Sequence, residues 1–106
     1  MDDVIVRGGE NISPGEIEDV LRQHPAVADV AVLGVPDDEW GEQVAAVITP
    51  RGEADPEALP EALKAFVRER LRSTKVPAQI RFQAELPYTE TGKLLRRVLK
   101  SGFAEG

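Results

Sequence analysis

The sequence predicts a small α+β domain, in which helices cover a three-stranded sheet and a short hairpin or strand precedes them. Three observations lead to this prediction. Several short segments are rich in valine and isoleucine or alternate apolar with polar residues, as strands do. Other segments repeat apolar residues at spacings of three and four, as amphipathic helices do. Glycine or proline separates most of them, so the 106 residues form one domain in the order β-α-β-β-α-β-α.

The first strand and the first helix flank a glycine pair. Residues 2–7 (DDVIVR) predict a short strand, which Gly8 and Gly9 end. A helix is then predicted to begin at Ser13, with a proline at its first position and with Glu16 completing a capping box. The apolar stripe of this helix consists of Ile17, Val20 and Leu21, and the helix ends at His24-Pro25.

Two apolar segments predict the centre of the sheet. Residues 26–35 read AVADVAVLGV, and their second half, residues 29–35, is expected to form a central strand. A polar loop with Trp40 and Gly41 leads to residues 42–50 (EQVAAVITP), the next strand. Because this connection is short, we expect the two strands to be neighbours and antiparallel.

The remaining elements follow a glycine turn. The next helix presents an apolar face, and its regular part is expected to begin near Pro60, because proline is tolerated only in the first turn. Residues 79–84 (QIRFQA) alternate and predict a third strand, and residues 94–99 predict a final short helix. The apolar face of the longer helix consists of Leu59, Leu63, Phe66, Val67 and Leu71.

Composition limits the classes of function. The net charge of −6 argues against general binding of nucleic acid, and no apolar run is long enough to span a membrane. The absence of cysteine excludes disulfides and thiolate sites and favours the cytoplasm. Residues 1–62 carry a net charge of −12 and residues 63–106 a net charge of +6. Either the C-terminal half faces an anionic ligand, or two faces of opposite charge attract each other within the fold.

Gly92 and Lys93 raise the question of a phosphate-binding loop. Such a loop needs a further glycine before the pair and a serine or threonine after the lysine. Pro87 and Leu94 occupy the relevant positions, so the sequence excludes this motif. The placement of Lys93 just before a helix is nevertheless unfavourable, because a helix dipole attracts anions there. A functional reason for this cation is one interpretation, and a solvated surface lysine is the other.

Two other residues are weighed in the same way. The single histidine, His24, lies at a helix end, where capping is a better interpretation than catalysis or metal binding. The single tryptophan, Trp40, is either a core residue or a flat apolar wall offered by a loop to a ligand. The sequence therefore contains no self-sufficient catalytic set and predicts no metal site.

Three stretches together resemble one family. These are DDVIVRGGENISPGEIEDVL, HPAVADVAVLGVPDDEWGEQVAAVI and LRSTKVPAQIRFQAELPYTETGKLLRRVL. In this order and spacing they resemble the C-terminal domain of acyl-CoA synthetases, within the adenylate-forming (AMP-binding) enzymes. The resemblance extends from Asp2 to about Lys100. It implies that residues 1–106 are the mobile C-terminal domain of a ligase whose large N-terminal domain is absent from this chain.

The resemblance also implies a reaction. The family's enzymes form an acyl-adenylate from a carboxylic acid and ATP with Mg²⁺, releasing pyrophosphate, and then transfer the acyl group to coenzyme A. The small domain presents a different face in each step. We therefore expect the partners to be the N-terminal domain, the acid, ATP and coenzyme A, with neither nucleic acid nor a membrane, and no cofactor bound tightly by this domain alone. The isolated domain is expected to be inactive.

The resemblance assigns roles to individual residues. Lys93 matches the adenylation lysine, a cation that would offset charge in the transition state. Gly8 and Gly9 match the loop that lines the pantetheine tunnel, and Trp40 matches a residue that packs against the same arm. Asp2 matches the hinge about which the domain rotates.

Two departures from related adenylation domains favour a coenzyme A ligase over the loading of a carrier protein. They are the segment GENI at residues 9–12 and the segment LLR at residues 94–96. Thr74 replaces a usual aromatic residue, which puts stacking on the coenzyme A adenine in doubt. Lys75 remains a candidate for the coenzyme A phosphates on charge alone, together with Arg72 and Arg96.

Two alternatives stay open. The chain could be a stand-alone interaction module that binds coenzyme A or docks on a partner, or it could be the lid of an enzyme that loads a carrier protein. A further hypothesis is that acetylation of Lys93 switches the enzyme off by removing its charge.

Overall fold

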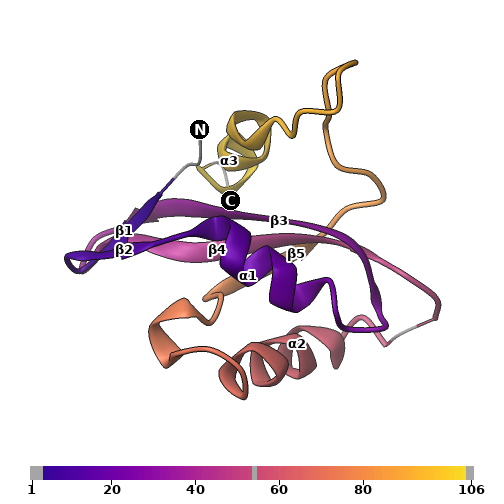
Figure 1. Ribbon diagram of the computed structural model, residues 1–106, viewed down its shortest axis with the longest axis horizontal. Helices are drawn as coiled ribbons and strands as arrows, with labels where there is room; N and C mark the ends of the chain where they lie inside the picture. Colours follow the sequence, from indigo (N-terminus) through magenta and orange to yellow (C-terminus); the bar gives the residue numbers. More distant parts are fainter. Residues whose placement is uncertain (1–3, 54, 105–106) are drawn as a thin grey trace.

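The computed structural model describes residues 4–53 and 55–104 and contains an α+β fold (Figure 1). In this part of the chain, five strands form one sheet and three α-helices pack against it. The strands are β1 (Ile5–Arg7), β2 (Glu10–Ile12), β3 (Val27–Asp37), β4 (Gly41–Pro50) and β5 (Gln79–Phe82). The helices are α1 (Pro14–Leu21), α2 (Leu59–Arg68) and α3 (Arg96–Ala104), with a short 3₁₀ helix, η1 (Ser73–Lys75).

The α+β class is confirmed, but the expected sheet of three strands is too small. β3 and β4 form a long antiparallel hairpin, as predicted, and β5 pairs in parallel with β4. β1 and β2 form a second hairpin, which joins the sheet through the pairing of Arg7 with Gly41. β2 gives no periodic signal in the sequence because it has only three residues, of which only Ile12 is buried.

Both faces of the β3–β4 hairpin are covered, which explains its continuous apolar sequence. Alternate residues such as Val30, Val32 and Ile48 face α1 and α2, whereas Ala31, Leu33 and Val47 face α3. Figure 1 shows α1 and α2 on one side of the sheet and α3 on the other.

The structure corrects several boundaries and one cap. β3 extends two residues beyond the predicted strand at each end, and α3 begins two residues later than predicted and runs five residues further. Ser13 has the extended backbone of an N-cap, but its side chain makes no capping hydrogen bond. The predicted capping box is therefore wrong. Glu16 instead forms an ion pair with Lys75, 2.6 Å away.

The outer edge of β3 is closed by side chains. In an antiparallel sheet both backbone groups of a residue point the same way, and those of Val32 point to this open edge. The Val32 N–H donates to Glu18 Oε2 at 2.8 Å, and the Val32 carbonyl accepts from Arg96 Nε at 3.1 Å. Arg96 Nη2 also lies 2.6 Å from Glu18 Oε2. This ion pair therefore supplies hydrogen-bond partners to both backbone groups of Val32 at the edge, and it attaches α3 to α1.

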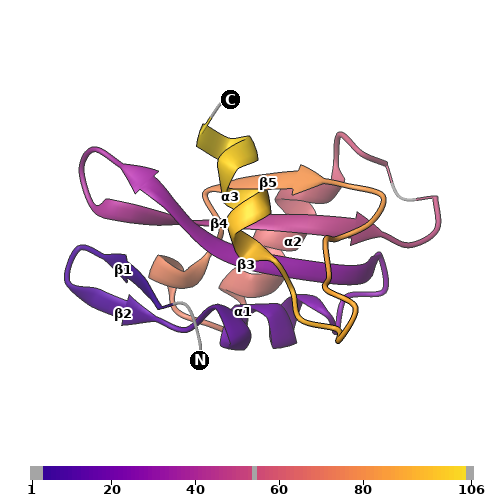
Figure 2. The same cartoon turned by 90° about the horizontal axis from the view of Figure 1, so that it is seen from above.

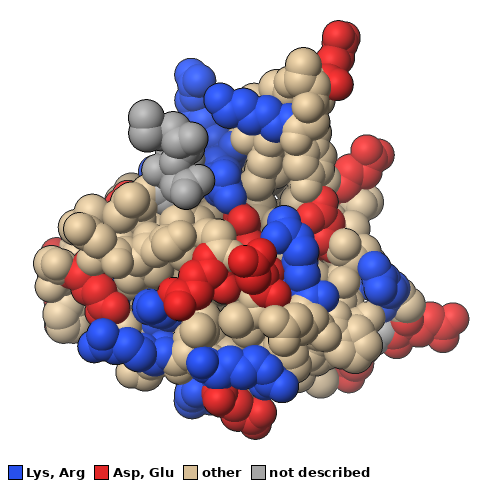
Figure 3. Space-filling model, viewed as in Figure 1, with Lys and Arg blue, Asp and Glu red and all other residues tan. Residues whose placement is uncertain are grey.

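Charges of the two halves of the sequence meet in the fold. Ion pairs join Glu10 with Arg72, Glu16 with Lys75, Glu18 with Arg96, and Glu42 with Lys100. Figure 3 shows acidic side chains gathered across the middle of one face, with Lys and Arg above and below them. Acidic side chains of the N-terminal half are therefore partly neutralised by basic side chains of the C-terminal half within the domain. Among the described residues, no helix is long and apolar enough to cross a membrane.

Candidate functional site

Gly8 and Gly9 form the two-residue turn between β1 and β2. Their φ angles are +57° and +87°, a backbone conformation that residues other than glycine rarely adopt. Two positive φ angles in a two-residue loop are typical of the turn that matches the twist of a hairpin. Both glycines are exposed, so the turn offers bare backbone at one end of the sheet.

Trp40 lies directly against this turn. Its carbonyl accepts a hydrogen bond from the Gly8 N–H at 2.8 Å, and its ring would come within 2.7 Å of a Cβ atom at Gly8. The Arg7 guanidinium lies 4.9 Å from the centre of the ring. The Asp37 carboxylate holds the loop by accepting from the Trp40 N–H at 2.8 Å. Trp40 is 44% exposed, so it is a surface tryptophan and not a core residue.

Lys75 belongs to the same end of the domain. η1 packs beside the start of α1, where Lys75 Nζ meets Glu16 and the Lys75 side chain is 18% exposed. Arg72 lies 3.9 Å from Glu10 of β2. The Thr74 hydroxyl is buried and finds no hydrogen-bond partner among the described residues. Figure 2 shows the hairpin of β1 and β2 on the left, at the end of the sheet where β3 turns into β4.

Lys93 lies on a closed turn between β5 and α3. The Thr89 N–H donates to the Lys93 carbonyl at 2.8 Å, and the Lys93 N–H donates to Thr89 Oγ1 at 3.0 Å. Gly92 has a φ of +89°, which the turn requires. Lys93 is exposed, and its ammonium makes no ion pair within the described residues. The turn therefore presents a free cation on a fixed backbone.

Tyr88 and Asp29 attach this turn to the sheet. The Tyr88 hydroxyl donates to Asp29 Oδ2 at 2.5 Å, and Tyr88 forms an isolated bridge with Leu94. The hydrogen bond to Asp29, followed by burial, raises the pKa of Tyr88 above its ordinary value of 10.0, so the phenol keeps its proton near neutral pH. Neither residue is a candidate in the sequence, because they lie 59 positions apart and carry no motif.

The candidate residues form two groups at opposite ends of the β3–β4 hairpin. Gly8 and Trp40 lie beside its turn, whereas the Lys93 turn is attached at Asp29, which pairs with Thr49 near the other end. Asp29 and Asp37 lie eight positions apart along β3, which corresponds to roughly 25 Å. Figure 1 shows the turn at the upper right and the hairpin of β1 and β2 at the left. The hinge candidate, Asp2, lies outside the described residues.

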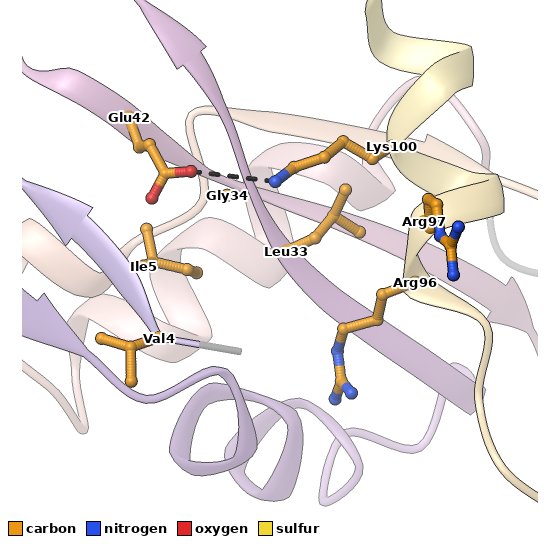
Figure 4. A pocket seen from close by; sticks show the side chains of 8 residues that line it. All are labelled: Val4, Ile5, Leu33, Gly34, Glu42, Arg96, Arg97 and Lys100. Carbon is orange, nitrogen blue, oxygen red and sulfur yellow. Dashed lines mark ion pairs between the residues drawn. The ribbon is translucent and has the colours of Figure 1, made fainter. Parts of the chain in front are cut away.

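One cavity of the described structure is lined by none of the residues of these two groups. It has a volume of about 440 Å³ and lies between the start of β1, β3 and α3. Figure 4 shows Lys100 reaching from α3 toward Glu42, and the two side chains lie 3.8 Å apart. Arg96 borders the cavity, but its guanidinium is bonded to Glu18 and to the backbone of Val32. These bonds give Arg96 a structural role, and its interpretation as a phosphate ligand stays a prediction.

Comparisons with known proteins agree on one family. Residues 16–93 match the model of the AMP-binding enzyme C-terminal domain. The chain is 47% identical to a 2-succinylbenzoate–CoA ligase of Geobacillus kaustophilus, over 92% of this chain and 20% of that protein. It is 41% identical to the medium/long-chain-fatty-acid–CoA ligase FadD8 of Mycobacterium tuberculosis, over 98% of this chain and 19% of that protein.

A solved structure gives the same result. The crystal structure of a Brucella canis acyl-CoA synthetase superimposes with a TM-score of 0.89 at 42% identity, and the match covers 98% of this chain and 19% of that one. The chain thus spans about a fifth of the length of the relatives that it matches. Sequence, fold and coverage together establish that it belongs to the AMP-binding enzyme C-terminal domain family of the adenylate-forming acyl-CoA ligases.

Proposed function

We propose that this chain is the mobile C-terminal domain of an acyl-CoA synthetase. The complete enzyme would join a carboxylic acid to ATP and then transfer the acyl group to coenzyme A, with the N-terminal domain holding ATP, Mg²⁺ and the acid. Three relatives named as CoA ligases or acyl-CoA synthetases support this proposal, each matched over nearly the whole of this chain. A cytoplasmic location, expected from the absence of cysteine, is part of the same proposal.

Lys93 would act in the first step. The carboxylate oxygen attacks the α-phosphorus of ATP, and the bond between this phosphorus and the bridging oxygen breaks as pyrophosphate leaves. Negative charge gathers on the α-phosphate oxygens in the transition state, and an ammonium held beside them offsets it. The closed turn supports this role, because the Lys93 backbone is held at both its N–H and its carbonyl while the side chain stays exposed.

The end of the sheet around Gly8 would act in the second step. The thiol of coenzyme A attacks the acyl carbon of the adenylate, and AMP leaves. Gly8 and Gly9 lack side chains at an exposed turn, which would let the pantetheine arm run close to the backbone, with Trp40 as a flat wall beside it. Lys75 has three donors, of which Glu16 takes one, so it can also face a phosphate.

The observation that carries the proposal is the separation of these two groups by the length of the hairpin. A single docked position of a rigid domain cannot bring both ends to one reaction centre, so the domain must rotate between the steps. Asp2 is the proposed hinge. The separation explains why a family of two-step ligases would need a mobile domain.

The test separates the two steps. This chain is fused to the N-terminal region of the Mycobacterium tuberculosis relative, with decanoate as the acid. Lys93→Ala is expected to slow decanoate-dependent exchange of pyrophosphate into ATP by about a hundredfold or more. Formation of decanoyl-CoA from preformed decanoyl-adenylate is expected to change by less than about threefold.

Arg68→Ala, which removes an exposed cation of α2 that makes no ion pair within the described residues, is the matched control and should leave both steps unchanged. Equal losses in both steps for Lys93→Ala would refute the assigned role. Full exchange activity in that variant would refute it as well.

A further inference from the structure

The turn that presents Lys93 is closed on itself. Its backbone hydrogen bonds run between Thr89 and Lys93, between Gly92 and Thr89, and between Leu95 and Pro87. These bonds fix the internal shape of the turn. They do not fix its orientation, because none of them reaches the sheet or a helix.

One hydrogen bond supplies that orientation. Among the described residues, the Tyr88 hydroxyl makes the only hydrogen bond from residues 87–94 to another element, and its acceptor is Asp29 of β3. The other contacts of the turn with the body are apolar, through the buried Leu86 and the partly buried Leu94. Apolar contacts resist separation but are not directional, whereas a hydrogen bond is.

The acceptor is itself held from the other side. Asp29 Oδ1 accepts from the Val30 N–H at 2.8 Å. It also lies 3.8 Å from the guanidinium of Arg22, the residue that follows α1. Oδ2 is thereby directed to Tyr88. Tyr88 in turn is bridged to Leu94, the residue after Lys93, so a shift at Tyr88 is carried directly to the lysine.

We propose that Tyr88 is a positioning residue for adenylation, because its bond to Asp29 holds the Lys93 turn in one orientation relative to the sheet. This inference rests on the proposed function of Lys93. It concerns only the first step, since the thioester end lies at the other end of the hairpin. An error of about 1 Å in the placement of a reacting group can lower a rate by about a hundredfold.

The experiment uses the fusion ligase with decanoate, as above. Tyr88→Phe removes the hydroxyl and keeps the ring. It is expected to lower kcat for pyrophosphate exchange about tenfold, with KM for ATP changed by less than about twofold, because the proposed role of Tyr88 is to orient Lys93 and not to bind the nucleotide. Decanoyl-CoA formation from preformed decanoyl-adenylate is expected to stay within about twofold of the parent.

The double variant Tyr88→Phe/Lys93→Ala distinguishes positioning from a general structural role. If Tyr88 acts through Lys93, the double variant is expected to be no slower in exchange than Lys93→Ala alone. Ser101→Ala is the matched control, because it also removes one surface hydroxyl hydrogen bond, at 2.8 Å to Val98 in α3. It should leave both steps unchanged.

Each outcome decides one statement. Equal losses in both steps for Tyr88→Phe, or an additive loss in the double variant, would overturn the positioning role and leave a structural one. Normal exchange in Tyr88→Phe while Lys93→Ala is impaired would overturn this inference alone. Normal exchange in Lys93→Ala would instead remove the proposed function on which it rests.

Discussion

Replacing Arg96 with alanine tests whether the ion pair at the edge of β3 holds the domain together. The substitution removes the guanidinium from Glu18, whose side chain is only 7% exposed, and leaves that carboxylate with a single donor, the Val32 N–H. It also leaves the Val32 carbonyl without the Arg96 donor. Both losses fall on one edge of the sheet.

The expected loss of stability in Arg96→Ala follows from how deeply the ion pair is buried. Breaking a buried ion pair by removing one partner costs about 3–5 kcal/mol of the free energy of unfolding. The Arg96 side chain is 24% exposed, so water can replace part of what it donates. We therefore expect a loss of about 2–3 kcal/mol, which lowers the melting temperature of a domain of this size by about 10–20 °C.

Urea and thermal unfolding of the domain, followed by circular dichroism, measure this loss. Arg97→Ala is the control, because Arg97 is exposed and makes no ion pair within the described residues; it should change stability by less than about 0.5 kcal/mol. Removing both partners, Glu18 and Arg96, should cost less than the sum of the single changes, since neither charge is then left buried alone. Unchanged stability of Arg96→Ala together with a raised KM for coenzyme A in the fusion ligase would refute the reasoning and restore Arg96 as a phosphate ligand.

Two further predictions concern the end of the sheet where Gly8 and Gly9 lie against Trp40. Gly9→Ala is expected to cost about 1 kcal/mol, because only the positive φ is unfavourable, and Gly8→Ala about 2 kcal/mol, because a Cβ there also meets the Trp40 ring at 2.7 Å. Unfolding in urea measures both, and equal losses would contradict the contact with Trp40. Titration of the isolated domain with coenzyme A, followed by Trp40 fluorescence, is expected to show no binding below about 1 mM, since the missing domain would complete the site. Micromolar binding would favour the stand-alone module instead.

The local elements could be predicted from the sequence because each has its own signal. The valine-rich segment up to Val35 and the strand after Gly41 are predicted as neighbours, and they pair as β3 and β4. The helix α2 begins beside Pro60, as proline requires. The short N-terminal hairpin or strand expected from the sequence is a hairpin of β1 and β2, but the residues of β2 could not be predicted, since three residues carry no periodicity. The capping box failed because Glu16 finds Lys75, 59 residues away, a stronger partner than the helix end.

The sequence by itself determined the family and the order of the main elements, and it indicated candidate site residues, because these depend on local patterns and motifs. It showed Lys93 on a polar turn and Gly8-Gly9 between two segments. Only the tertiary structure decided how the two groups lie. Pairing along β3 and β4 puts them at opposite ends of one hairpin, and Tyr88–Asp29 and Arg96–Glu18 fix the turn and α3 from 59 and 78 residues away. Such contacts have no sequence signal, because a hydrogen bond depends on distance in space and not along the chain.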